Sequence, residues 1–160
     1  MLIELQRIKD KPTLSIEERV ELYKKIFKDS IALDPVKAFV MPTDRIGALE
    51  AIRELNTTLS DLYMVSLPVI TCWVRDDSYV SATGEIYLTE PHLGAFLHQF
   101  RHHLQNVERK YERRGLTAEG LNGAFYRVPY EKCIYKLYGE DDARAWATFL
   151  LESVNMSGSN

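Results

Sequence analysis

Residues 93–111 read LGAFLHQFRHHLQNVERKY and have the spacing of an amphipathic helix. Apolar residues recur every three or four positions and share one helical stripe, which consists of Leu93, Phe96, Leu97, Phe100, Leu104, Val107 and Tyr111. Thr89 is a suitable cap, Pro91 is tolerated in the first turn, and Gly115 marks a suitable end. We therefore expect a long helix whose apolar face packs against a core.

The expected helix also contains all four histidines of the chain: His92, His98, His102 and His103. His98 and His102 are one turn apart and project from a sector outside the apolar stripe. Two imidazoles at this spacing can converge on one tetrahedral zinc ion, with bonds of about 2.0–2.1 Å. A solvated polar helix face is the competing interpretation, because paired histidines alone are a weak signal.

Length and composition predict one globular domain, over residues 1–155, with a flexible tail at 156–160. Of the 160 residues, 46% are hydrophobic and 27% charged, and the net charge of −3 disfavours nucleic acids and anionic membranes as partners. Charges interrupt the apolar residues of the N-terminus, so a signal peptide or membrane span is not expected there. We expect a soluble, cytoplasmic protein in which Cys72 and Cys133 are buried free thiols.

The rest of the chain predicts a mixture of helices and short strands. The expected elements are a helix over 16–30 opened by a Ser15 and Glu18 capping box, a strand over 36–41, a helix capped by Thr43 or Asp44 that reaches a polar break at 57–61, and neighbouring strands at 68–74 and 85–88. A final helix is expected after Pro129, running across or restarting at Gly139 and continuing to Val154. The predicted fold class is α+β.

Two segments resemble the zincin metallopeptidases: Gly84-Glu-Ile-Tyr-Leu88, and the run from Phe96 to Gln105 that contains His98-Gln-Phe-Arg-His102. They are similar to the edge strand and to the active-site helix of that superfamily, whose helix carries a His-Glu-x-x-His motif. The resemblance implies a zincin-like fold with a small mixed sheet, and Zn²⁺ bound by His98 and His102. It also implies a peptide or protein substrate that lies extended along Glu85, Ile86, Tyr87 and Leu88.

The resemblance further implies a third zinc ligand on a C-terminal helix, commonly an acidic residue that precedes alanine and an aromatic residue. The segment over residues 140–147, EDDARAWA, is similar to that pattern, and Asp142 is the position carried over from it. Glu140 and Glu131 are the alternatives. An acidic residue in the first turn of a helix also interacts favourably with the helix dipole without any metal.

Gln99 stands where the resembling enzymes have their catalytic glutamate, which accepts a proton from the attacking water. A neutral amide cannot accept that proton, and a positioned base contributes about 10²–10⁴ in rate, or about 3–5.5 kcal/mol. The chain is thus expected to keep its metal and to be nearly inactive. Either it is a natural pseudoenzyme or Gln99 was introduced into an active peptidase. The alternative function is a non-catalytic binding module that recognises a protein partner.

Four other residues are candidates for contacts with a substrate or a reaction intermediate near the metal. Arg101 and His103 are interpreted as solvated helix residues, with stabilisation of an oxyanion or a substrate carboxylate as the alternative. Tyr126 and Tyr130 lie between the two expected ligand helices, where a phenol could donate a hydrogen bond to a tetrahedral intermediate.

Overall fold

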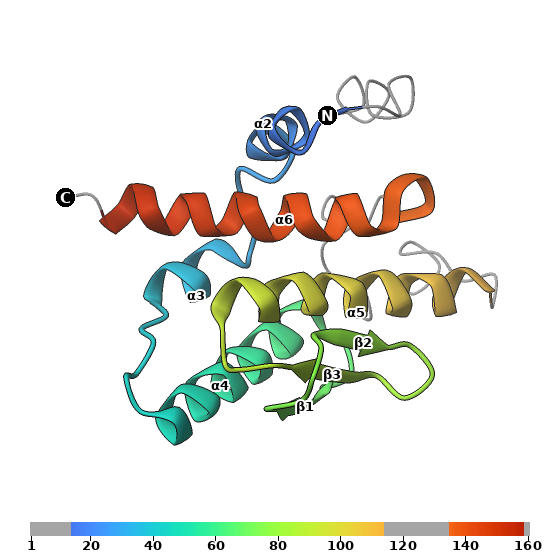
Figure 1. Ribbon diagram of the computed structural model, residues 1–160. Coiled ribbons are helices and arrows are strands. Elements are labelled where there is room, and N and C mark those ends of the chain that lie inside the picture. Colours follow the sequence, from blue (N-terminus) through green and yellow to red (C-terminus); the bar gives the residue numbers. More distant parts are fainter. Residues whose placement is uncertain (1–13, 114–134, 159–160) are drawn as a thin grey trace.

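The computed structural model describes residues 14–113 and 135–158, and within these ranges the protein is a mixed α+β structure (Figure 1). Its elements are α2 (Ile16–Ile26), α3 (Leu33–Ala38), α4 (Arg45–Tyr63), β1 (Val69–Cys72), β2 (Ser78–Val80), β3 (Glu85–Leu88), α5 (Leu93–Arg113) and α6 (Tyr135–Gly158). The predicted α+β class is confirmed. Candidate residues Tyr126, Tyr130, Glu131 and Cys133 lie outside the described residues.

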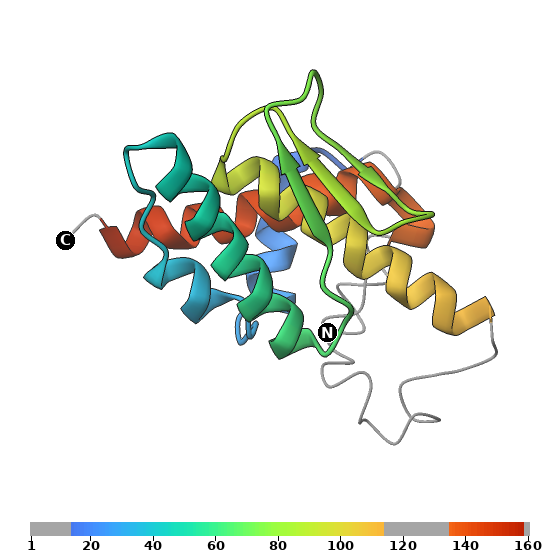
Figure 2. The same cartoon turned by 90° about the horizontal axis from the view of Figure 1, so that it is seen from below.

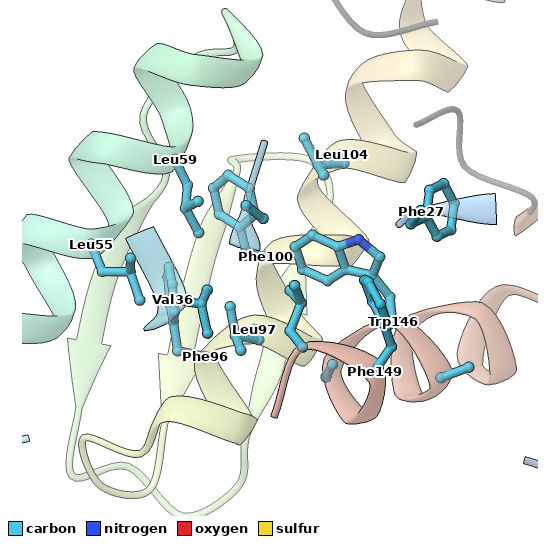
Figure 3. Packing of buried hydrophobic residues seen from close by; sticks show 14 of the residues in the cluster. Phe27, Val36, Leu55, Leu59, Phe96, Leu97, Phe100, Leu104, Trp146 and Phe149 are labelled. Carbon is cyan, nitrogen blue, oxygen red and sulfur yellow. The ribbon is translucent and has the colours of Figure 1, made fainter. Parts of the chain in front are cut away.

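Helix α5 is the central element, with the sheet on one side and α6 on the other (Figures 1 and 2). The expected apolar stripe of α5 forms the middle of the core, where Phe96, Leu97 and Phe100 are fully buried (Figure 3). The ring of Phe100 stacks on Trp146 of α6, with centroids 6.5 Å apart. Packing of these large side chains fixes α6 against α5, and the candidate site lies along that junction.

The three strands form one sheet in the order β1-β3-β2, with β1 parallel and β2 antiparallel to β3. The prediction that the segments around β1 and β3 are neighbouring strands is confirmed. The prediction of an edge strand at Glu85–Leu88 is wrong, because β1 and β2 pair with the two sides of β3. Ile86 and Leu88 are fully buried in the core. A strand paired on both sides has no free backbone groups to hold an extended substrate.

Two predictions of secondary structure are wrong, because packing against the core decides both segments. The segment expected as a strand over 36–41 begins inside helix α3, and the chain becomes extended only from Phe39. Pro35 occupies the first turn of this helix, where its missing N–H costs nothing, and Val36 is buried in the core. The expected polar break at 57–61 is helical, because α4 presents Leu59 to the core and continues to Tyr63.

The ends of the two site helices also differ from expectation. Helix α5 is capped by His92, whose Nδ1 accepts a hydrogen bond from the backbone N–H of Ala95 at 3.1 Å, and not by Thr89. Helix α6 passes Gly139 without interruption and continues to Gly158, so it is longer than the predicted helix, which ends at Val154. Residues 139–142 therefore sit within one continuous helix that faces α5.

Asp44, one of the two predicted caps, closes the N-terminus of α4 by accepting a hydrogen bond from the N–H of Gly47 at 2.7 Å. Replacing Asp44 with alanine is expected to lower the free energy of unfolding by about 1 kcal/mol, since a backbone donor loses its partner. Thermal or urea denaturation measures this. Thr43→Ala is the matched control, with an expected change of at most about 0.5 kcal/mol. A larger loss of stability in Thr43→Ala than in Asp44→Ala would identify Thr43 as the cap instead.

Candidate metal centre

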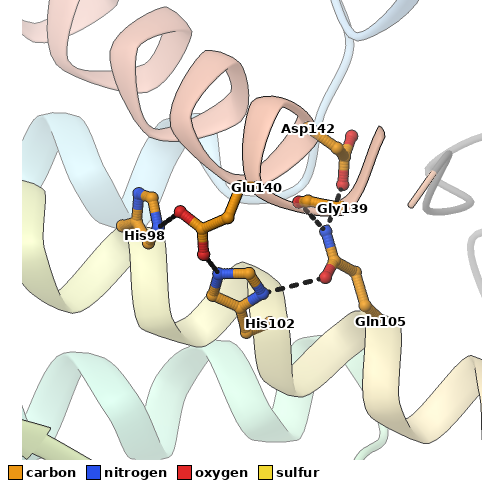
Figure 4. Close-up of polar contacts among 6 residues, drawn as sticks. All are labelled: His98, His102, Gln105, Gly139, Glu140 and Asp142. Carbon is orange, nitrogen blue, oxygen red and sulfur yellow. Dashed lines mark hydrogen bonds and ion pairs between the residues drawn. The ribbon is translucent and has the colours of Figure 1, made fainter. Parts of the chain in front are cut away.

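The His98 and His102 side chains project from α5 toward α6, side by side, with ring centroids 5.1 Å apart (Figure 4). The two side chains are only 20% and 19% exposed, which is far from a solvated helix face. The spacing of four residues along a helix is what places both rings on one side. The predicted convergence of the two imidazoles is confirmed by their geometry.

Glu140 of α6 lies between the two rings and contacts both (Figure 4). Its Oε2 is 3.2 Å from Nε2 of His98, and its Oε1 is 2.6 Å from Nε2 of His102. One ligand atom from each of the three residues lies within 4.8 Å of the others. Ligand atoms around a tetrahedral zinc ion with bonds of about 2.0–2.1 Å are about 3.4 Å apart, so small shifts of the three side chains suffice.

The charge states of His98 and Glu140 suit a metal. Burial lowers the pKa of the His98 imidazole, because the charged form loses its hydration, so the neutral ring with a free lone pair is favoured. Burial by itself raises the pKa of Glu140, but the neighbouring imidazoles of His102 and His98 outweigh that effect and the pKa is lowered. Neutral imidazole and ionised carboxylate are the forms that bind zinc.

Asp142, the position carried over from the resemblance, does not face the histidines, and this expectation requires correction. Its side chain is 0% exposed, and each of its two oxygens accepts two hydrogen bonds. Oδ1 accepts from Tyr23 at 2.6 Å and from Nη2 of Arg101 at 3.2 Å. Oδ2 accepts from Nε of Arg101 at 2.9 Å and from Gln105 at 2.8 Å. A carboxylate with its lone pairs occupied in this way is not available to a metal, and Glu140 is the carboxylate of α6 that lies against the two imidazoles.

Arg101 is fully buried and pairs with Asp142 in the interior, so its interpretation as a solvated residue is wrong. Its guanidinium lies over the rings of Phe27 and Trp146, at 5.4 and 5.3 Å from their centroids. Burial, followed by the charge of Asp142, raises the pKa of Tyr23 well above its ordinary value, which keeps this phenol a hydrogen-bond donor. The cluster joins α2, α5 and α6 behind the candidate metal centre.

A polar pocket of about 460 Å³ opens beside the histidine pair. Helix α5 contributes one wall, the segment around β2 contributes another, and the lining residues are Asp77, Ser78, Tyr79, Ser81, His98, Gln99, His102, Gln105, Asn106, Arg109 and Glu140. Gln99 is 8% exposed and lines the same pocket as the candidate ligands. The structure thus places Gln99 beside the site, although it assigns no role to the amide.

His103 is buried behind the pocket wall, so the solvated interpretation is wrong for this residue too. Its Nε2 donates to the carbonyl of Ser66 at 2.7 Å, which leaves Nδ1 to accept from the Tyr79 hydroxyl at 2.8 Å. Asn106 donates to the same hydroxyl at 2.9 Å. Burial lowers the pKa of His103 and supports the neutral ring. His103 therefore fixes the Tyr79 side chain in the wall of the pocket.

Gln105 was missed in the sequence, although it lies three residues after His102 on the same helical face. Its Oε1 is 2.9 Å from Nδ1 of His102 (Figure 4). Zinc-binding histidines generally donate their second ring N–H to an oxygen acceptor. A search for such an acceptor one helical turn from each histidine would have found this residue.

Comparison with known protein families, curated proteins and solved structures finds no match to this chain. Within residues 14–113 and 135–158, none of the helices has the combination of length and apolar composition needed to cross a membrane. The function is therefore inferred from the site itself.

Proposed function

We propose that this protein binds one Zn²⁺ through Nε2 of His98, Nε2 of His102 and the carboxylate of Glu140, on a zincin-like metallopeptidase scaffold. The observation that carries the proposal is the convergence of these three side chains, from two packed helices, at the edge of a polar pocket. Two histidines and one carboxylate are a ligand set of catalytic zinc sites, which leave a fourth position open to water or substrate.

Gln99 limits the hydrolytic activity that such a site could have. Bound zinc acts as a Lewis acid that lowers the pKa of a coordinated water. The residue after the first histidine then has to accept a proton from the attacking water, and the neutral amide of Gln99 cannot do so. The proposed activity, metal-dependent hydrolysis of a peptide bond, is thus strongly reduced in this chain. The same observation favours the second candidate function, a non-catalytic module that holds a protein partner in the pocket.

The proposed place for an extended peptide is β2, at the edge of the sheet that borders the pocket. Ser78 and Tyr79 of this strand line the pocket. At the opposite edge, α4 covers the carbonyls next to and within β1, where Asn56 donates to Pro68 at 2.9 Å and Arg53 to Ile70 at 3.4 Å. Main-chain pairing with an edge strand is a common mode of peptide recognition, and β2 replaces β3 in this role.

Restoring a carboxylate tests the enzyme proposal against the binding module. Gln99→Glu is expected to raise cleavage of a peptide library by about 100-fold or more, the usual contribution of a positioned base. A chelator should remove this gain. Asn106→Glu is the matched control, because it adds the same charge to the same pocket away from the base position. If Gln99→Glu binds zinc normally and cleaves no more than the control, the binding-module function replaces the peptidase function.

A further inference from the structure

The His102 ring is held on two sides, by a carboxylate and by a side-chain amide. Its Nε2 faces Glu140 at 2.6 Å, and its Nδ1 faces Oε1 of Gln105 at 2.9 Å (Figure 4). A neutral imidazole has one N–H donor and one lone-pair acceptor, so the nature of these neighbours decides which nitrogen carries the proton. The question is therefore whether Gln105 presents its oxygen or its nitrogen to the ring.

The surroundings of Gln105 settle the orientation of its amide. On the side away from His102, the amide is 2.9 Å from the carbonyl oxygen of Gly139 and 2.8 Å from Oδ2 of Asp142. Both atoms are acceptors, so the NH₂ group must point to them and the carbonyl oxygen must point to His102. The reversed amide would place its oxygen against two other oxygens and lose both hydrogen bonds.

Asp142 is itself held in place by Arg101 and Tyr23, through contacts of 2.6–3.2 Å. Arg101, Tyr23 and Gln105 all donate to the carboxylate of Asp142, which therefore holds the NH₂ group of Gln105 on its side and leaves the amide oxygen facing His102. Because Oε1 of Gln105 only accepts, Nδ1 of His102 carries a proton. The carboxylate of Glu140 also accepts, so Nε2 donates to it while no metal is bound, and a zinc ion would displace that second proton and bind the lone pair of Nε2.

We propose that Gln105 is a positioning residue of this site: it holds His102 in the tautomer protonated at Nδ1 and so presents Nε2 to the metal. This inference rests on the proposed zinc site and adds a role for Asp142, which acts as the anchor of Gln105 and not as a ligand. An acceptor of this kind orients the ring as well as selecting the tautomer, and its loss typically lowers metal affinity by about 10–100-fold.

The test compares two amides of the same pocket wall. Gln105→Met keeps the length of the side chain and removes its three hydrogen bonds. Asn106→Leu removes an amide that contacts Tyr79 and Ser81 but neither candidate ligand. Competition of Zn²⁺ against a chromogenic chelator is expected to show a loss of about 10–100-fold for Gln105→Met and less than about 3-fold for Asn106→Leu. Gln105→Ala is the second variant if methionine does not fit.

Imidazole nitrogen NMR supplies a readout that purely structural damage would not change. In the wild type, the His102 ring should be protonated at Nδ1, with zinc on Nε2, and Gln105→Met should give mixed tautomers or a rapidly exchanging Nδ1–H. Zinc bound through Nδ1 of His102, or equal affinity and an unchanged tautomer in Gln105→Met, would overturn the inference. Failure of the wild type to bind zinc would instead refute the proposed function, and slower exchange of the His102 Nδ1–H in the metal-free wild type than in Gln105→Met would still test the contact with Gln105.

Discussion

Replacement of Glu140 with alanine is expected to lower the affinity for Zn²⁺ by about 100-fold or more. Apparent binding free energies of about 10–16 kcal/mol, shared among the ligands of a zinc site, correspond to about 3 kcal/mol for each ligand. Glu140 is the carboxylate that lies between the two imidazoles, and its loss leaves His98 and His102 as the remaining ligands. Elemental analysis should give about one zinc per wild-type chain, and competition with a chelator measures the affinity.

Asp141→Ala is the matched control for this experiment, because it removes the same charge from the adjacent position of α6. Long-range electrostatics alone would lower the affinity similarly in both variants, since the net charge changes equally. Direct ligation predicts a large loss only for Glu140→Ala. If the wild type binds zinc and Glu140→Ala binds it equally well, Glu140 serves as an ion-pair partner of the histidines and the ligand assignment fails.

Replacement of Asp142 with alanine is expected to lower the free energy of unfolding by about 3–5 kcal/mol, the range for breaking a buried ion pair from one side. The carboxylate is fully buried, and its removal takes away four hydrogen bonds, from Tyr23, Arg101 and Gln105. The guanidinium of Arg101 then loses this carboxylate inside the core. Urea denaturation at fixed pH measures the change.

Two further measurements show why the stability falls. Most of the loss in Asp142→Ala should remain when a chelator removes the metal, because the contacts of Asp142 are to protein groups. The loss in Glu140→Ala should appear only when zinc is present, since a bound metal stabilises the folded state by mass action. Combining Asp142→Leu with Arg101→Met should cost less than the sum of the single changes, as apolar side chains often replace buried ion pairs well. A loss in Asp142→Ala that disappears with the chelator would make Asp142 a ligand after all.

Local sequence spacing was enough for the features that depend on one helix. The apolar stripe of α5 is buried as predicted from Phe96 to Val107, and His98 and His102 face the same way because residues four apart share a helical side. The capping box of α2 is present, with Ser15 and Glu18 each accepting a hydrogen bond from the backbone N–H of the other. These patterns concern neighbours within a few residues, so no long-range packing is needed to satisfy them.

The order of the strands could not be read from local patterns. The residues of β3 have the β-branched and aromatic character of a strand, but this does not distinguish a central strand from an edge. The three-residue strand β2 was missed, and its pairing with β3 places it at the sheet edge beside the pocket. Strand order depends on which segments meet in space, and a single segment carries little information about it.

The position of the third candidate ligand likewise depends on tertiary contacts and not on local sequence. The family resemblance favoured Asp142 and left Glu140 and Glu131 as alternatives, but the sequence could not say which carboxylate faces the histidines. Residues two apart on a helix point about 200° away from each other. The packing of Trp146 against Phe100 fixes the rotation of α6, so that Glu140 lies at the exposed rim between the imidazoles and Asp142 points inward to Arg101. The sequence alone thus determined the histidine pair, and the tertiary contacts between α5 and α6 decided which carboxylate lies between the two imidazoles.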